Sequence, residues 1–299
     1  MKTELGMSFF TDSKLRSEVI KIFNNYNIFV EFPEVGSRTS EVTFNIKVPL
    51  DKSINYDTVK VIYEYLEKQL KIDFIGEKIS FICSDDEYRE SPLFVLDSTG
   101  NSQSAFLEDK GTKFHKETFC EVCGLIQRDQ LSPLVIDTSK IKDRYMVNVG
   151  PFWVVSEKMV DLMNKWNLKG YDLNPVVHKG PESGSQQAYQ IIPKHTLPNW
   201  SSQMVYFYFA TEPEPCICGI KRTRYGPFHY DKEDLKDMDS DIYLPAEWTH
   251  DGRYVYKKTL FSKKFRDLII ENKISKDVRG SDDEKYGSKD WVLEPVILV

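Results

Sequence analysis

The chain has 299 residues, a formal net charge of −6 at pH 7 and 13% aromatic residues, which is enough length for about two domains with a buried core. The negative charge argues against a general nucleic-acid-binding protein, because neutralising phosphates requires a surplus of Lys and Arg. No run approaches the roughly 18 apolar residues of a membrane-spanning helix, and the first residues lack the apolar core of a secretory signal, so we expect a cytoplasmic protein.

Residues 1–105 are expected to form an N-terminal module of mixed α+β structure that contains neither of the cysteine pairs described below. Apolar residues at helical spacing predict helices over about 13–26 and 56–71, the first capped by Asp12. Cys83 stands alone among the cysteines and is expected in the core. Runs of β-branched and aromatic residues predict strands at 28–32, 42–48, 79–83 and 93–96. This order of elements is typical of an α/β sandwich with helices on one face of a sheet.

A polar segment at 97–111 separates this module from two diverged copies of one pattern, at 112–179 and 186–299, which we expect to form one domain. Each copy begins with a cysteine turn and continues through strands, one helix and a closing strand. The offset between the copies grows from 106 to 120 residues after the helix, which predicts a surface loop at 276–289. The matching segments are SEKMVDLMNKWNL (156–168) with SKKFRDLIIENKI (262–274), identical at four of thirteen positions, and LNPVV (173–177) with LEPVI (293–297).

The two cysteine pairs predict a metal site. The first cysteine turn is Cys120-Glu-Val-Cys123-Gly124, and the second is Cys216-Ile-Cys218-Gly219. In a reduced compartment such pairs bind zinc more often than they form disulfides, and structural zinc takes four ligands in a tetrahedron. A Gly after each pair suits a turn with positive φ that directs backbone N–H groups at the thiolates. We therefore expect one structural zinc ion, held by Cys120, Cys123, Cys216 and Cys218.

This prediction depends on the fold, because the pairs lie much farther apart than the 12 to 20 residues typical of compact zinc fingers. The second pair also has one intervening residue in place of two. The alternatives are turns that bind no metal and an occasional disulfide, whereas a thioredoxin-like role is disfavoured because no clear helix begins at the first turn. His115 precedes Cys120 by five residues and is a possible substitute ligand, although a packed or exposed histidine is the simpler interpretation.

The segment 231–241, which we call the acidic segment, carries six acidic residues against two lysines. Its centre, Asp237-Met-Asp239-Ser-Asp241, resembles the start of a calcium loop but lacks the turn Gly and the bidentate Glu of that motif. A solvated loop is the simple interpretation, and a docking surface for a basic protein partner is the more specific one. The candidate partner-binding residues are Asp231, Glu233, Asp234, Asp237, Asp239 and Asp241.

Motifs of catalysis are missing from the sequence. It has no nucleophile elbow, phosphate-binding Gly loop, dinucleotide fingerprint or paired-histidine metal motif, so we expect no enzymatic activity. The one basic cluster suited to a phosphate is Lys221-Arg-Thr-Arg224, for which surface ion pairs are the simpler interpretation.

Short motifs in both copies carry a family resemblance that covers about residues 112–299. In the first copy they are Cys120, Cys123, Gly124, Val155-Ser156-Glu157-Lys158, Leu168, Gly170, Pro175 and Val176; in the second they are Cys216, Cys218, Gly219, Ser262, Lys264, Leu293, Pro295 and Val296. With them the chain resembles the double-CXXCG proteins, which include immunity proteins of myxobacterial swarming-inhibition toxin systems and related immunity domains of bacterial polymorphic toxin systems. The resemblance implies a non-enzymatic protein that neutralises a cognate toxin by direct binding.

The sequence therefore predicts an N-terminal α/β sandwich module followed by two cysteine-knuckle/strand/helix/strand units that share a four-cysteine zinc site. The predicted function is that of a cytoplasmic immunity protein, with charge speeding its encounter with the toxin and aromatic rings holding the complex. The alternative is a zinc-ribbon-like protein associated with nucleic acid or transcription. The net charge of −6 argues against this alternative. A metal-dependent hydrolase would need an open coordination position, which four thiolates do not leave.

Overall fold

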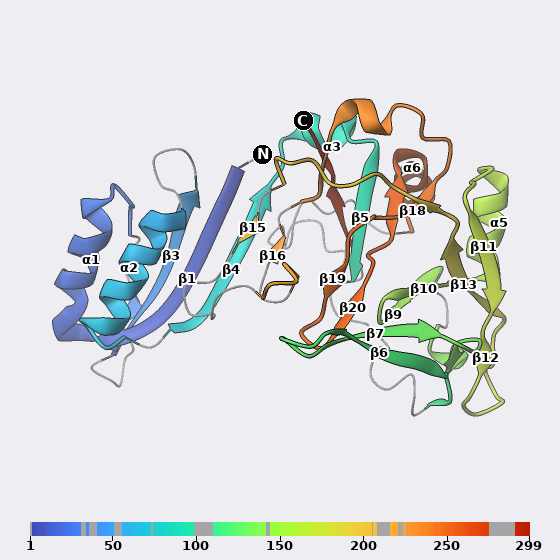
Figure 1. Cartoon of the computed structure of the whole chain (residues 1–299), viewed down its shortest axis with the longest axis horizontal. Coiled ribbons are helices and arrows are strands. Elements are labelled where there is room, and N and C mark those ends of the chain that lie inside the picture. Colours follow the sequence, from blue (N-terminus) through green and yellow to red (C-terminus); the bar gives the residue numbers. More distant parts are fainter. Residues whose placement is uncertain are drawn as a thin grey trace. The chain divides into compact units, whose positions relative to one another are not determined.

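The computed structural model of this chain has a mixed α+β fold with several separate sheets (Figure 1). Its chain divides into two compact units, unit 1 with Met1–Asp85 and Phe207–Pro213, and unit 2 with Asp86–Tyr206 and Glu214–Val299. Among the described residues, no helix is long and apolar enough to cross a membrane. The structure describes residues 2–30, 34–35, 41–50, 56–72, 74–98, 110–141, 144–204, 206–207, 216–220, 224–225, 227–274 and 291–299.

Unit 1 is a four-stranded sheet of order β2-β3-β1-β4, in which the long central strand β1 pairs antiparallel with both β3 and β4. Every second residue of β1 and β3 is buried and packs with apolar residues of two helices, which gives this unit a core of its own. The elements are β1 (Lys2–Asp12), η1 (Ser13–Leu15), α1 (Arg16–Asn25), β2 (Glu34–Val35), β3 (Glu41–Leu50), α2 (Tyr56–Lys68) and β4 (Phe74–Ile82).

The N-terminal predictions are confirmed in part. Asp12 caps the first helical turn, where its side chain accepts a hydrogen bond of 2.9 Å from the Lys14 backbone N–H. The prediction of a strand at 28–32 is wrong for residues 28–30, the part of this range that the structure describes. Asn27 has a positive φ of 58°, and the Ile28 N–H donates to the Phe23 carbonyl over 3.0 Å, so this segment ends α1 instead of joining the sheet. Strand β1 was not predicted, and Cys83 lies half-buried just after β4.

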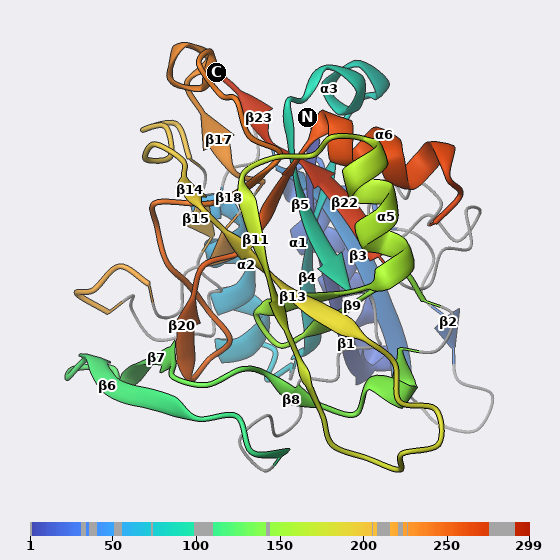
Figure 2. The ribbon, with the colours of Figure 1, turned by 90° about the vertical axis from the view of Figure 1, so that its right-hand side faces the viewer.

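Two larger sheets build unit 2 (Figure 2). The first has the order β11-β13-β10-β9 and is formed by β9 (Met146–Val149), β10 (Phe152–Ser156), β11 (Tyr171–Pro175) and β13 (Ala188–Pro193). The second has the order β14-β18-β21-β5-β22 and is formed by β5 (Leu93–Ser98), β14 (His195–Thr196), β18 (Ile242–Leu244), β21 (Leu260–Ser262) and β22 (Trp291–Pro295). Strand β5 thus pairs with strands near the C-terminus, and the compact unit 1 ends before it.

One helix follows a strand of each sheet. Helix α5 (Glu157–Lys165) follows β10, and α6 (Lys263–Glu271) follows β21. Both helices bury apolar side chains in one shared cluster of unit 2, which includes Met159, Met163, Phe265, Leu268 and Ile269. Just after each helix one non-glycine residue with positive φ, Asn167 (51°) or Lys273 (53°), ends the helical conformation.

Short parallel pairs and a third sheet complete unit 2. Strand β12 (Val177–His178) pairs with β8 (Val135–Ile136), and β23 (Ile297–Leu298) pairs with β17 (His229–Tyr230). The third sheet, of order β19-β20-β7-β6, has β6 (Phe114–Cys120), β7 (Leu125–Gln130), β19 (Thr249–His250) and β20 (Tyr254–Tyr256). The other described elements are α3 (Asp85–Glu90), η2 (Thr138–Lys140), β15 (Tyr206–Phe207), β16 (Arg224–Tyr225) and η3 (Lys232–Leu235).

Candidate metal centre

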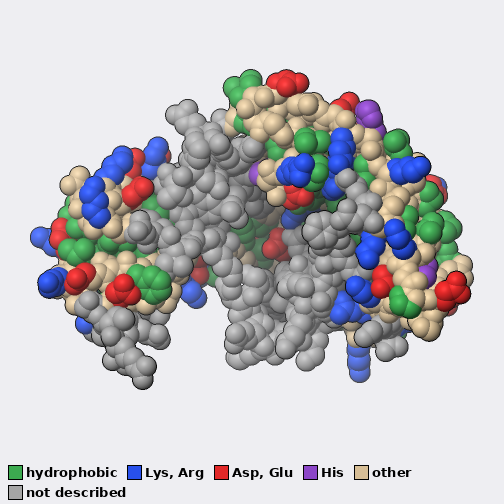
Figure 3. Space-filling view, turned by 90° about the horizontal axis from the view of Figure 1, so that it is seen from below, with side chains coloured by type: hydrophobic (Ala, Val, Ile, Leu, Met, Phe, Trp, Pro, Cys, Tyr) green, Lys and Arg blue, Asp and Glu red, His purple; other side chains and the backbone are tan. Residues whose placement is uncertain are grey.

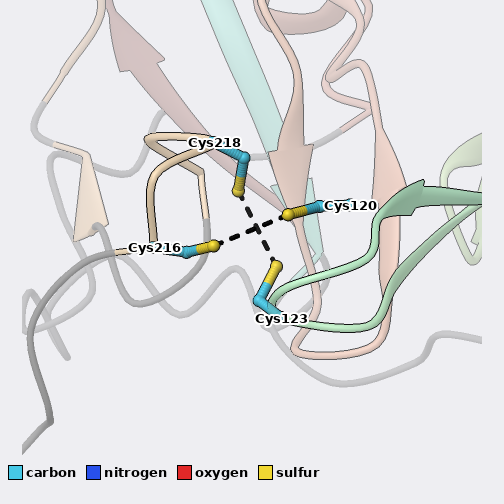
Figure 4. Close-up of side chains that lie close together, drawn as sticks. All are labelled: Cys120, Cys123, Cys216 and Cys218. Atoms are coloured by element: carbon cyan, nitrogen blue, oxygen red, sulfur yellow. Dashed lines mark hydrogen bonds between the residues drawn. The ribbon is translucent and has the colours of Figure 1, made fainter.

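The four predicted cysteines meet in one cluster (Figure 4). Cys120 ends strand β6, Cys123 lies in the turn that leads to β7, and the other two come from the second cysteine turn. The Sγ atoms of Cys120 and Cys216 lie 3.5 Å apart, and those of Cys123 and Cys218 lie 3.7 Å apart. All four sulfur atoms lie within 4.8 Å of one another. The fold therefore brings together two turns that are far apart in the chain, as the sequence predicts.

The spacing of the sulfurs suits one metal ion. Four thiolates at about 2.3 Å from a tetrahedral zinc ion lie about 3.8 Å from one another. The measured contacts of 3.5 and 3.7 Å lie close to that value. All four side chains are half-buried, so the cluster is partly shielded from water. Four cysteines arranged in this way are able to bind a metal ion, and they would fill its coordination sphere.

The two cysteine turns close in the same way despite their different lengths. The Gly124 N–H donates to the Cys120 carbonyl, and the Gly219 N–H donates to the Cys216 carbonyl, each over 2.8 Å. Both glycines have positive φ, 69° and 71°. The second turn makes the equivalent hydrogen bond with one residue fewer, so its shorter spacing does not prevent it from presenting two sulfurs.

Replacing Gly219 by alanine is expected to destabilise the protein by about 1 kcal/mol, because an L-residue with a Cβ atom disfavours the left-handed region. Contact with other parts of the chain does not contribute, since a Cβ atom at Gly219 would have no heavy atom beyond its chain neighbours within 4 Å. Gly219→Asn is the matched control and should cost less, because asparagine tolerates this conformation. Urea denaturation of both variants measures the difference, and equal losses would show that φ is not the cause.

The thiols of the first turn differ in acidity. The backbone N–H of Cys123 hydrogen-bonds to the Cys120 sulfur and lowers the pKa of that thiol to about 7. Burial raises the pKa of the Cys123 thiol to about 12. A bound cation keeps its coordinating thiols deprotonated. Zinc would therefore supply the positive charge that the more buried thiolate needs.

The residues around the cluster include some that sequence patterns did not indicate. Phe119, next to Cys120, packs edge-on against Trp248 with ring centroids 5.9 Å apart, and Lys257 lies 5.3 Å from the centroid of the same Trp ring. At the tips of the turns, Val122 is 69% exposed and Ile217 is 87% exposed. The four cysteines are thus held by backbone turns, with flanking rings beside Cys120, while the residues within the turns face solvent. His115 is exposed on β6 and is not a member of the cluster.

The acidic segment is exposed except at its end. Asp231, Glu233, Asp234, Asp237 and Asp239 are exposed. Asp241 is only 7% exposed, and including it among the surface residues was wrong. Its Oδ2 accepts a 2.8 Å bond from the Lys169 N–H, and its Oδ1 accepts a 2.6 Å bond from the Ser262 hydroxyl, which itself caps α6. The Asp241 carboxylate therefore fixes the start of α6 and does not reach a partner.

Replacing Asp241 by alanine is expected to cost roughly 2–4 kcal/mol, because the Lys169 N–H and the Ser262 hydroxyl both lose a buried acceptor. The matched control is Asp239→Ala, which removes an exposed carboxylate from the same segment and should change the free energy of unfolding by less than about 0.5 kcal/mol. Chemical denaturation compares the two variants. Similar effects would contradict a structural role that is specific to Asp241.

Some predicted features lie outside the described residues. These are the loop at 276–289, most of the polar segment at 97–111, and Lys221 to Thr223 of the basic cluster, whose last residue, Arg224, begins β16. Comparison of the chain with known protein families, with curated proteins and with solved structures found no match.

Proposed function

We propose that the cysteine cluster holds one structural zinc ion, and that this ion joins two copies of a repeated unit. Zinc is the metal best suited to four thiolates in a closed tetrahedral site, where it stabilises a fold without taking part in a reaction. The observation that carries the proposal is the convergence of two pairs of sulfurs from two similar turns, with contacts of 3.5 and 3.7 Å.

The pairing of the two larger sheets supports a repeat. Strand β13 lies between β10 and β11 in the first sheet, and β5 lies between β21 and β22 in the second. Val155 pairs with Tyr189 in the first sheet, and Phe261 pairs with Phe94 in the second. Each of these strand triplets has a helix after its first member and a closing strand that ends in proline. The second sheet thus repeats the register of the first.

Hydrogen bonds outside the ladders repeat as well. The Val176 N–H donates to the Ala188 carbonyl over 3.1 Å, and the Val296 N–H donates to the Leu93 carbonyl over 3.0 Å. Ala188 lies 95 residues after Leu93, and Cys218 lies 95 residues after Cys123. The strand before each cysteine turn and the turn itself therefore belong to one repeating unit.

In this repeat, each copy contributes its first strand to the sheet of the other copy. Strand β5 precedes the first cysteine turn along the chain, but it completes the sheet that contains β21 and β22. Strand β13 precedes the second turn, but it completes the sheet that contains β10 and β11. Each copy thus supplies a central strand to the other. The proposed zinc ion would join the two copies at the cysteine turns, which follow the exchanged strands along the chain.

We further propose that the protein acts by binding, as an immunity protein that neutralises a cognate bacterial toxin. Three observations support this function. The motifs of the cysteine turns resemble the double-CXXCG family, four thiolates leave a zinc ion no position for a substrate, and five exposed acidic residues lie together at 231–239. An acidic surface of this kind speeds encounter with a basic partner and adds specificity.

Two experiments test the proposed function. Metal analysis of protein purified without chelator should find about one zinc per chain, and its absence would overturn the structural site.

Coexpression with the product of an adjacent toxin gene should yield a complex that copurifies and protects cells. The variant Asp234→Lys/Asp237→Lys should slow association and reduce its dependence on salt. A toxin that remains fully active in the presence of the protein would contradict the immunity function.

A second candidate function, binding of single-stranded nucleic acid, is favoured by one face of the third sheet. Lys116 and Arg128 are paired on neighbouring strands and share a face, whereas Asp129 lies on the other face. The Arg128 guanidinium lies 3.8 Å from the Tyr254 ring centroid and 5.1 Å from that of Phe114. Lys and Arg side chains also gather on the side of unit 2 seen in Figure 3. A salt-dependent gel shift with single-stranded oligonucleotides would favour this function over toxin binding.

A further inference from the structure

The cysteine cluster has a second chemical property that follows from how close its sulfurs lie. Contacts between the sulfurs of the two cysteine turns include Cys120 to Cys216 at 3.5 Å and Cys123 to Cys218 at 3.7 Å. The two contacts cross each other near the centre of the cluster (Figure 4). A disulfide needs its sulfurs about 2.0 Å apart. The sulfurs of each pair therefore need to approach by less than 2 Å for a disulfide to form.

We propose that the cluster is also a site of oxidation, at which a peroxide forms the disulfides Cys120–Cys216 and Cys123–Cys218. This modification releases the metal and keeps the two copies covalently joined. The release of zinc rests on the proposed function. The formation of the disulfides rests only on the positions of the sulfurs.

The chemistry balances with hydrogen peroxide as the oxidant. A thiolate attacks one peroxide oxygen, the O–O bond breaks, and the products are a sulfenic acid and hydroxide. The facing thiolate then attacks the sulfenic sulfur, forming the S–S bond and releasing a second hydroxide. Each disulfide consumes one peroxide and transfers two electrons to it. Two peroxides oxidise the whole cluster, and the metal leaves as a divalent cation because disulfide sulfurs are no longer thiolate ligands.

Pairing between the turns is favoured over pairing within them by the short second turn. Cys216 and Cys218 have one residue between them, so a disulfide within this turn would close a small, strained ring. If Cys120 and Cys123 paired with each other, only this strained pairing would remain for the other two. Pairing across the turns uses all four sulfurs without the strained ring within the second turn.

Oxidation and chelation should therefore have opposite effects on the link between the two cysteine turns, and thus on the melting temperature. Removal of zinc by a chelator leaves the two turns without a link. The two disulfides connect residues 96 and 95 positions apart in the chain, and crosslinks across long loops restrict the unfolded state strongly. The oxidised protein should keep its melting temperature in the presence of a chelator, whereas the reduced protein should melt at a clearly lower temperature.

Peptide mapping of the full-length protein after hydrogen peroxide treatment tests the proposal. Trypsin cleaves after Lys116, Arg128, Lys194 and Lys221, so each cysteine pair lies on one peptide, 117–128 or 195–221. The expected product is a single species that contains both peptides and separates on reduction. Only one of the five cysteines, Cys83, should still react with a thiol reagent. Two separate peptides, each lighter by two hydrogen atoms, or five unchanged thiols would overturn the proposal.

Two variants sharpen the result. Cys83→Ser removes the one cysteine outside the cluster and should leave the map unchanged. In Cys216→Ser, the remaining disulfide should still join the two peptides through Cys123 and Cys218, and a disulfide within peptide 117–128 would contradict the pairing. A chromogenic chelator records zinc release in the same reaction. Protein that contains no zinc but gives the joined peptides would overturn the zinc proposal alone, and zinc-bound protein without joined peptides would overturn the redox proposal alone.

Discussion

Cys123→Ser is expected to abolish zinc binding and to reduce the free energy of unfolding of unit 2 by more than about 4 kcal/mol. Loss of a metal is among the few single changes with effects of this size, because zinc affinity is part of the folding free energy. All five tryptophans, Trp153, Trp166, Trp200, Trp248 and Trp291, belong to unit 2. Tryptophan fluorescence during urea denaturation therefore reports this unit, and elemental analysis of the same sample gives the zinc content.

The matched control for this variant is Cys83→Ser, which makes the same chemical change outside the cluster. It should retain one zinc per chain and a nearly unchanged denaturation midpoint. A chelator added to the wild-type protein should reproduce the effect of Cys123→Ser. The structural role of zinc would be contradicted if Cys123→Ser bound no zinc and yet unfolded at the wild-type midpoint.

The four cysteines of the candidate metal centre were predictable from local sequence, and the reason is physical. Each turn carries its own chemistry, namely two cysteines and a glycine that needs positive φ, and Gly124 and Gly219 do have φ of 69° and 71°. The position of one turn relative to the other depends on strand pairings between residues far apart in the chain. No local pattern contains that information, so the meeting of the two turns had to be a hypothesis at the sequence level.

Burial was the property that sequence patterns predicted least well. Asp241 follows four exposed acidic residues within the preceding eight positions and looks like one of them in the sequence. It is buried because its carboxylate satisfies two donors that come from distant parts of the chain. Strand β1 was missed although Leu5, Met7 and Phe9 alternate regularly along it, because Gly6 lies between them and glycine is depleted in strands. The strands and helices with regular apolar spacing, such as β3 and α2, were predicted correctly.

The boundary of the larger unit leads to the second large prediction. A chain that begins at residue 86 is expected to fold and bind zinc, whereas one that begins at residue 106, after the predicted N-terminal module, is expected not to fold. The second chain lacks β5, whose side chains Leu93, Phe94, Val95 and Leu96 are between 0% and 5% exposed. Burial of four such side chains contributes roughly 8 kcal/mol, which is comparable with the whole stability of a typical domain.

The two truncated chains also test whether the second copy needs strand β5 of the first copy in order to fold. Without β5, strands β21 and β22 lose the partner between them, although every residue of both cysteine turns is still present. Zinc content, tryptophan emission and the cooperativity of urea denaturation should all be retained from residue 86 and lost from residue 106. A full-length Phe94→Ala variant should lie between them, destabilised by about 3–5 kcal/mol. A folded, zinc-binding chain that starts at residue 106 would show that the first copy does not donate its strand to the second.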